Sequence, residues 1–122
     1  MNAYKLLREK INKKKAKICV VGLGYVGLPL AVNFAQKGYF VYGFDTNSAR
    51  LKNLKKGIKY IVDIEPQDVL SLIKKGKFVP TAKEKALGDS EVIIVCVPTP
   101  LRKIKIPDIS YIVKASRTIK KY

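Results

Sequence analysis

Short apolar runs alternate along the chain with segments in which apolar residues recur every three or four positions. The runs at 17–21 (KICVV), 39–44 (YFVYGF) and 91–97 (EVIIVCV) predict three strands, and 78–81 predicts a weaker one. Helical spacing predicts helices over 3–14, from the glycine-rich stretch 22–27 to about 37, over about 47–57, over 66–76 and from 107 onward, with a helical turn at 84–87. This alternation predicts an α/β fold, in which a parallel sheet carries helices on both faces.

Glycine, proline and small polar residues mark the ends of these elements. Gly38 is expected to end the helix before it in the left-handed conformation, and either Thr46 or Asn47 to cap the helix that follows. Pro66 suits the first turn of a helix. The last helix is expected to start at residues 107–108 (Pro-Asp).

Three glycines follow the first predicted strand directly. Gly22, Gly24 and Gly27 form the pattern G-x-G-x-x-G between a strand and a helix, which is the context that a dinucleotide-binding turn requires. The first glycine permits a tight turn, the second lets the backbone approach a pyrophosphate, and the third lets helix and strand pack closely. The free amides and the positive end of the helix dipole bind phosphate charge. The alternative is a turn without a ligand, but the context favours a Rossmann-type doubly wound sheet.

An acidic residue, Asp45, stands at the end of the second predicted strand. There its carboxylate can accept hydrogen bonds from both hydroxyls of an adenosine ribose, and it would repel a 2′-phosphate, so NAD is favoured over NADP. The alternative role of Asp45 is to cap a helix. Arg50 opens another possibility, since an arginine near this point can hold a 2′-phosphate. With Asp45 at the strand end, Arg50 is instead expected to reach the adenine or a phosphate of NAD.

The segment Val97-Pro98-Thr99 lies just past the fourth predicted strand. In a doubly wound sheet this position is the rim of the ligand crevice, beside the turn of the first strand. Backbone groups there can line a cofactor ribose, and the Thr99 hydroxyl can donate a hydrogen bond. A rigid loop without a ligand explains the segment equally well, and both interpretations stay open.

The formal net charge of +16 raises the possibility of nucleic-acid binding. The lysines are scattered along the whole chain, arginines are few, and no RNA-binding signature with interleaved aromatic residues occurs. Lysine-rich solvated surfaces are the better explanation, and no nucleic-acid partner is expected. The positive field still favours anionic ligands, including dinucleotides.

Membrane, secretory and zinc-binding classes have no support in the sequence. No apolar run is long enough to span a bilayer, and the charged segment 1–17 lacks the apolar core of a secretory signal. Cys19 and Cys96 lie inside apolar runs, which is typical of buried thiols in a reducing cytoplasm. The chain has no histidine and no CxxC pair. A cytoplasmic protein without a bound metal is expected.

Four segments together resemble the UDP-glucose/GDP-mannose dehydrogenase family. They are 17–31, which contains Gly-Leu-Gly-Tyr-Val-Gly, and 42–54, 92–101 and 107–111. Gly-Leu-Gly-Tyr-Val-Gly is far more specific than the generic glycine pattern. The continuation Leu28-Pro29-Leu30 and the form Val-Pro-Thr-Pro-Leu are most similar to the branch that acts on UDP-N-acetylhexosamines. On this basis we expect an N-terminal helix over 1–14 and part of an NAD-binding domain over 15–122.

The resemblance implies a reaction and a set of cofactor residues. The family oxidises the C6 alcohol of a nucleotide sugar to a carboxylate with two NAD in sequence, through an aldehyde held on a cysteine. The positions that would contact NAD are Gly22 to Gly27 with Tyr25 and Val26 among them, Asp45, Arg50, and Val97, Pro98 and Thr99 continuing to Leu101. Tyr25 is also a candidate for the substrate side of the crevice.

The resemblance also implies what the chain lacks. Family members have a second domain, and their catalytic cysteine, with a lysine and an asparagine near it, lies well beyond residue 122. Neither Cys19 nor Cys96 matches that cysteine. The substrate domain is therefore absent, and this chain alone is expected to be inactive. Lys103 and Lys105 are expected to be solvated loop residues.

The predicted strand order 3-2-1-4 leaves strand 91–97 at a sheet edge. An apolar edge strand invites pairing with another chain, so we expect a homo-oligomer formed through it unless the last helix covers the edge.

Three other functions remain open from the sequence. They are a stand-alone NAD-binding module or partner subunit, a different Rossmann enzyme such as a hydroxyacid dehydrogenase, and a basic nucleic-acid binder.

Overall fold

The computed structural model describes residues 2–100 and 108–122. The predictions for Leu101, Lys103, Lys105 and a helix start at Pro107 lie outside the described residues. The elements, in chain order, are α1 (Ala3–Asn12), β1 (Lys17–Val21), α2 (Gly27–Gln36), β2 (Phe40–Phe44), α3 (Ser48–Lys56), α4 (Pro66–Lys74), β3 (Phe78–Thr81), α5 (Lys85–Gly88), β4 (Val92–Val95) and α6 (Ser110–Lys121).

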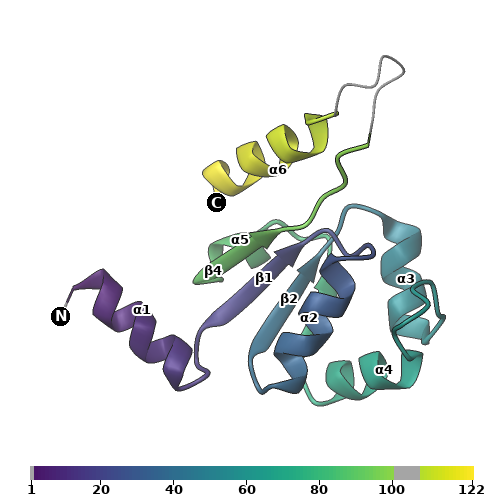
Figure 1. The fold of residues 1–122 in the computed structure, drawn as a ribbon, viewed down its shortest axis with the longest axis horizontal. Coiled ribbons are helices and arrows are strands. Elements are labelled where there is room, and N and C mark those ends of the chain that lie inside the picture. The colour runs from purple at the N-terminus through teal and green to yellow at the C-terminus, as the bar shows by residue number, and fades with distance from the viewer. Residues whose placement is uncertain (1, 101–107) are drawn as a thin grey trace.

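The strands form one parallel sheet in the order β3-β2-β1-β4. This confirms the predicted Rossmann-type α/β fold and the predicted strand order. Helices cover both faces of the sheet (Figure 1). Because successive side chains of a strand point to opposite faces, β1 supplies both layers of the core. Ile18 and Val20 pack with α2, α3 and α4, whereas Cys19 and Val21 pack with α5 and α6.

Local sequence signals set most element ends as predicted. Gly38 follows α2 with a φ of 102°, in the left-handed region that favours glycine. Asn47, rather than Thr46, caps α3, and its side chain accepts the N–H of Arg50 at 3.0 Å. Pro66 is the first residue of α4.

Several element ends differ from the sequence prediction, three of them with a visible cause. Helix α1 ends at Asn12 rather than at residue 14, because Lys14 adopts a φ of 57° where the chain turns into β1. Strand β4 covers 92–95 rather than 91–97, since the chain beyond it bends toward the turn after β1. Helix α6 begins at Ser110, and Asp108 accepts the N–H of Ser110 at 2.9 Å.

Helix α1 and strand β4 lie at the periphery of the fold. Helix α1 projects from the sheet near the start of β1 (Figure 1) and has no buried residue. Among the described residues, β4 pairs with β1 alone. Helix α6 packs against one face of the sheet through Ala115 and Ile119. The carboxyl ends of β1, β2 and β4 thus lie together, and the loops that follow them form the candidate site.

Candidate functional site

The turn between β1 and α2 is shaped by its glycines. Gly22 has a φ of 97°, and a Cβ placed on it would lie 2.7 Å from the carbonyl oxygen of Cys96. Only glycine fits there without strain. A Cβ placed on Gly24, in contrast, would meet no described atom within 4 Å, so this position faces open space. The backbone at Gly24 is therefore open to an incoming group.

Unpaired N–H groups line this turn. Within the described part of the chain, the main-chain N–H groups of Gly24, Tyr25 and Val26 donate to no protein atom. No side chain caps the start of α2. Helix N-termini carry partial positive charge, so this turn presents donors and a favourable dipole to an anion. The side chains of Tyr25 and Val26 are 80% and 67% exposed and point into solvent beside it.

Asp45, just after β2, fastens the second strand to this turn. It is the buried charged residue of the described core, with 7% exposure. Its Oδ2 accepts the main-chain N–H of Leu23 at 2.9 Å, and its Oδ1 accepts the N–H of Asn47 at 2.8 Å. The sequence predicted the strand-end position of Asp45 but not the bond to Leu23. The structure brings the glycine turn and the carboxylate together, as dinucleotide binding requires.

Arg50 lies against Asp45 on the first turn of α3. Its Nη1 donates to Asp45 Oδ2 at 3.1 Å, and its guanidinium carbon lies 5.6 Å from the centre of the Tyr60 ring. The guanidinium is thus held between a carboxylate and an aromatic face.

Tyr60 is a site residue that the sequence analysis missed. Its hydroxyl donates to the carbonyl oxygen of Leu23 at 2.8 Å, across the gap between the loop 57–65 and the glycine turn. Burial raises the pKa of Tyr60 well above its ordinary value, although the nearby Arg50 charge opposes this, so the hydroxyl stays a donor at neutral pH. A loop tyrosine between a lysine and an isoleucine has no periodic signal that would mark it as a site residue.

A groove of about 290 Å³ opens beside these residues. It runs between the glycine turn, the first turns of α3 and the loop before α4. Polar and aromatic groups dominate its lining, which includes Gly24, Tyr25, Asn47, Arg50, Asn53 and Tyr60. Asn47 was predicted only as a helix cap, and Asn53 was not singled out.

The segment after β4 runs past the same turn. The Val97 nitrogen would lie 3.2 Å from a Cβ on Gly22, so this backbone borders the glycine turn. Val97 is half-buried in the core cluster that contains Cys19 and Phe44. Pro98 and Thr99 are exposed. The segment thus occupies the predicted rim position.

The two cysteines have no nucleophilic setting. Burial raises the pKa of Cys19 to about 12, although a backbone hydrogen bond involving Phe44 opposes the shift. Burial also raises the pKa of Cys96, which is half-buried. A thiol must ionise to attack, so both are poor nucleophiles, as the sequence analysis expected. The described site can hold an anionic ligand but offers no group for covalent catalysis.

The residues present fit a dinucleotide. Free N–H groups and an open glycine suit a pyrophosphate, and the Asp45 carboxylate at the end of the neighbouring strand suits a ribose hydroxyl. A sequence profile of the UDP-glucose/GDP-mannose dehydrogenase family, NAD-binding domain, matches residues 16–122. The chain belongs to this family. Its cofactor is accordingly NAD, the nucleotide that the domain of this family binds.

Two curated relatives of this NAD-binding domain are named as dehydrogenases of UDP-N-acetyl sugars. The chain is 42% identical over 107 residues to UDP-N-acetyl-D-mannosamine dehydrogenase of Pyrococcus horikoshii, covering 84% of the chain and 25% of the relative. It is 43% identical over 108 residues to UDP-N-acetyl-D-glucosamine 6-dehydrogenase of Pseudomonas aeruginosa, covering 88% and 25%. The chain thus spans about a quarter of the length of the relatives that it matches.

Solved structures of the family share the fold. The UDP-N-acetyl-mannosamine dehydrogenase of Pyrococcus horikoshii superposes with a TM-score of 0.79 at 38% identity, covering 86% of this chain and 25% of that one. A ternary complex of GDP-mannose dehydrogenase from Pseudomonas aeruginosa gives a TM-score of 0.77 at 33% identity, covering 84% and 24%. In the described residues, no helix has the length and apolar character needed to cross a membrane.

Proposed function

We propose that this chain is the NAD-binding part of a nucleotide-sugar 6-dehydrogenase that oxidises the C6 alcohol of a UDP-N-acetylhexosamine to the uronate. The relatives named above support this substrate class. By itself the chain binds NAD and oxidises no sugar, because burial leaves both Cys19 and Cys96 poor nucleophiles. The observation that carries the proposal is the set of unpaired N–H groups at Gly24–Val26 beside the buried Asp45 carboxylate.

Each site residue has a distinct role in this proposal. The N–H groups of Gly24, Tyr25 and Val26 bind the pyrophosphate, with Gly22 and Gly27 shaping the turn and fixing the helix behind it. Asp45 accepts a ribose hydroxyl, because its carboxylate has about four acceptor positions and three are occupied by protein donors. Arg50 borders the same ribose. When bound, NAD supplies the hydride acceptor of the reaction.

The rim segment and Tyr25 complete the proposed cofactor site. Val97, Pro98 and Thr99 line the nicotinamide half of the crevice with backbone groups, and the Thr99 hydroxyl donates to the cofactor ribose. The exposed ring of Tyr25 covers the pyrophosphate and faces the substrate side. These assignments rest on the place of the residues at the carboxyl ends of β1 and β4.

Titration of the chain with NAD tests the proposal. The wild-type chain is expected to bind NAD, and Asp45→Asn to weaken binding by about tenfold, because the substituted amide is a weaker partner for a ribose diol. Asp63→Asn, an exposed aspartate in the loop before α4, is the matched control. Circular dichroism establishes that each variant is folded. Equal NAD affinity of the wild type and Asp45→Asn would contradict the proposed site.

Three further properties belong to this proposal. The N-terminal segment that carries α1 lies outside the NAD-binding domain of 15–122, and the parent enzyme works in the cytoplasm. The chain also self-associates through β4, which pairs on one side only within the described residues. Support for self-association comes from Val95, which is 37% exposed on this edge, and from α6, which covers a face of the sheet rather than its edge.

A further inference from the structure

Four residues around the candidate site form a closed circuit of contacts. Leu23 donates its N–H to Asp45 Oδ2 at 2.9 Å, and Arg50 donates to the same oxygen at 3.1 Å. The guanidinium carbon of Arg50 lies 5.6 Å from the centre of the Tyr60 ring. Tyr60 in turn contacts Leu23, because its hydroxyl donates to the Leu23 carbonyl oxygen at 2.8 Å. The circuit joins the glycine turn, the end of β2, helix α3 and the loop before α4.

The bond from Tyr60 controls the direction of an N–H group in the phosphate-binding turn. The Leu23 carbonyl and the Gly24 N–H belong to one planar trans peptide, so they point in opposite directions. A hydroxyl that holds the carbonyl therefore also fixes the Gly24 N–H, which has no protein acceptor among the described residues. Without the hydroxyl this peptide would have no hydrogen bond to the described residues, because the Leu23 N–H that donates to Asp45 belongs to the preceding Gly22–Leu23 peptide.

The ring of Tyr60 acts on the other half of the circuit. A guanidinium over an aromatic face is attracted to it, and this contact holds Arg50 on Asp45. Arg50 in this position leaves one side of the Asp45 carboxylate to the ribose and stays away from the place of a 2′-phosphate.

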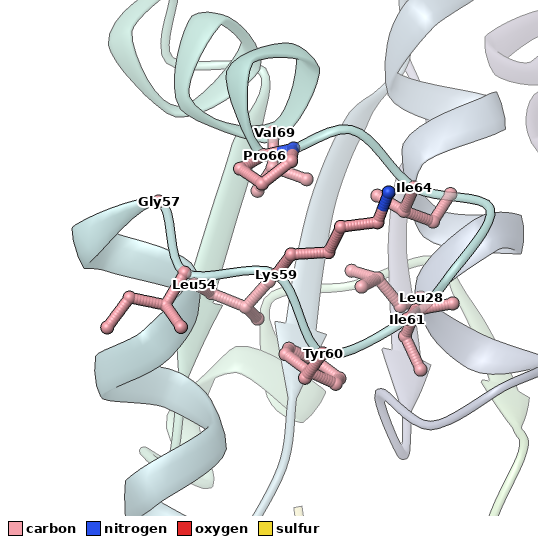
Figure 2. Close-up of a pocket in the computed structure, with 10 residues that line it drawn as sticks. Leu28, Leu54, Gly57, Lys59, Tyr60, Ile61, Ile64, Pro66 and Val69 are labelled. Atoms are coloured by element: carbon pink, nitrogen blue, oxygen red, sulfur yellow. The ribbon is translucent and has the colours of Figure 1, made fainter.

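The loop that carries Tyr60 is fixed by the core. Figure 2 shows it running from Gly57 to Pro66, with Leu28, Ile61 and Ile64 around the same small cavity as Tyr60. This cavity holds about 10 Å³, and Leu28 and Ile61 are 1% and 5% exposed. Interior packing this close leaves the loop little freedom. Tyr60 thus projects from a rigid support toward the turn.

We propose that Tyr60 is a positioning residue of the dinucleotide site, which orients the Leu23–Gly24 peptide through its hydroxyl and holds Arg50 on Asp45 through its ring. The inference rests on the proposed function. It adds a residue outside the glycine turn and the strand ends, and it makes two separable statements. The hydroxyl governs affinity for the pyrophosphate, and the ring governs discrimination between NAD and NADP.

The chain supplies a matched control for the hydroxyl. Tyr39 donates its hydroxyl to the carbonyl oxygen of Ile11 at 2.9 Å, away from the groove. Tyr60→Phe and Tyr39→Phe each remove one tyrosine bond to a main-chain carbonyl. Tyr60→Phe is expected to weaken NAD binding by about threefold to tenfold, whereas Tyr39→Phe leaves it unchanged. In the free chain, the amide resonance of Gly24 is expected to shift in Tyr60→Phe and not in Tyr39→Phe.

The ring is tested by Tyr60→Leu. With the aromatic face removed, Arg50 is free to leave Asp45, so the ratio of the Kd for NADP to the Kd for NAD is expected to fall by about twofold to fivefold. Tyr60→Phe, which keeps the ring, is expected to retain the wild-type ratio. Loss of stability alone would move both affinities together and leave this ratio unchanged.

The outcomes separate this inference from the proposed function. If the wild-type chain binds NAD and Tyr60→Phe binds it equally well, the role of Tyr60 is overturned while the proposed function stands. If Tyr60→Phe unfolds while Tyr39→Phe stays folded, Tyr60 has a structural role only, and the inference is overturned. If the wild-type chain does not bind NAD, the proposed function and the inference fail together.

Discussion

Gly27 lies so close to Gly22 that a Cβ placed on Gly27 would stand 1.6 Å from the Gly22 carbonyl oxygen. Helix α2 therefore begins in direct backbone contact with the end of β1. This contact sets the distance between the helix N-terminus and the turn, and hence the place where an anion meets the free N–H groups. Gly27, the third glycine of the motif, lets helix α2 pack closely on the end of β1, whereas Gly24, the second, leaves the turn open to a ligand.

The two roles predict opposite behaviour for two alanine substitutions. Gly27→Ala is expected to lower the free energy of unfolding by about 3 kcal/mol, because a methyl group overlaps a carbonyl that cannot retreat. Gly24→Ala is expected to leave stability within about 0.5 kcal/mol, because its Cβ meets no described atom within 4 Å, yet to weaken NAD binding by about tenfold or more. Urea denaturation and NAD titration of both variants check this. A Gly27→Ala chain as stable as the wild type would contradict the packing role.

The sequence predicts those parts of the structure that short-range patterns encode. The strand β1, the glycine turn and the strand-end position of Asp45 follow from residues close together in the chain. The order of the strands follows from the usual order of the Rossmann-type fold that the glycine motif predicts.

The contacts that complete the site are long-range, which explains why the sequence does not predict them. The bond from Tyr60 to Leu23 spans 37 positions, and the bond from Leu23 to Asp45 spans 22. No periodicity connects such pairs. The end of β4 also escapes prediction, because Cys96 still donates to the Val21 carbonyl at 2.7 Å while the chain is already bending toward the turn.

A pH dependence is expected at Glu91, which anchors α1. Its carboxylate accepts the Lys17 N–H at 2.7 Å and pairs with the Lys10 ammonium at 3.0 Å. Burial raises the pKa of Glu91, but the hydrogen bonds and the Lys10 charge together outweigh burial, so the pKa lies below its ordinary value of 4.5. A carboxyl group with a lowered pKa stabilises the fold above its ordinary pKa, and this contribution is lost as the pH falls through the folded-state pKa.

Glu91→Gln measures this contribution. At pH 7 the variant is expected to be less stable than the wild type by about 1 kcal/mol, and the difference should shrink as the pH falls below 4.5. Glu84→Gln is the control, since the Glu84 side chain makes no hydrogen bond or ion pair within the described residues. Urea midpoints at several pH values provide the measurement. A difference that stays constant down to pH 3 would rule out the anchoring charge.

The two thiols are expected to resist alkylation in the folded chain. At pH 8 a Cys19 thiol with a pKa of about 12 is almost entirely protonated, and the thiolate is the reactive form. Iodoacetamide should therefore label Cys19 at least about 100-fold more slowly in the folded chain than in urea, and the half-buried Cys96 should fall between these rates. Mass spectrometry of timed samples measures both sites. Fast labelling of Cys19 without denaturant would contradict the burial of its side chain.

The exposed edge of β4 predicts self-association. Its outer N–H and C=O groups have no strand partner among the described residues, and Val95 is 37% exposed there. The net charge of +16 opposes association, so the test belongs at about 0.5 M salt, where repulsion between chains is screened. Sedimentation of the wild type is expected to show a dimer fraction that rises with concentration.

A lysine on this edge should prevent the dimer, because a charge between paired edge strands must lose its water. Val95→Lys is therefore expected to sediment as a monomer at every concentration. Val62→Lys adds the same charge at a position 78% exposed in the loop before α4, and it should behave as the wild type does. If the wild type stays monomeric at high concentration and its amides along 92–95 exchange rapidly, β4 is a frayed edge rather than an interface. If Val62→Lys abolishes the dimer as fully as Val95→Lys, charge rather than the edge controls association.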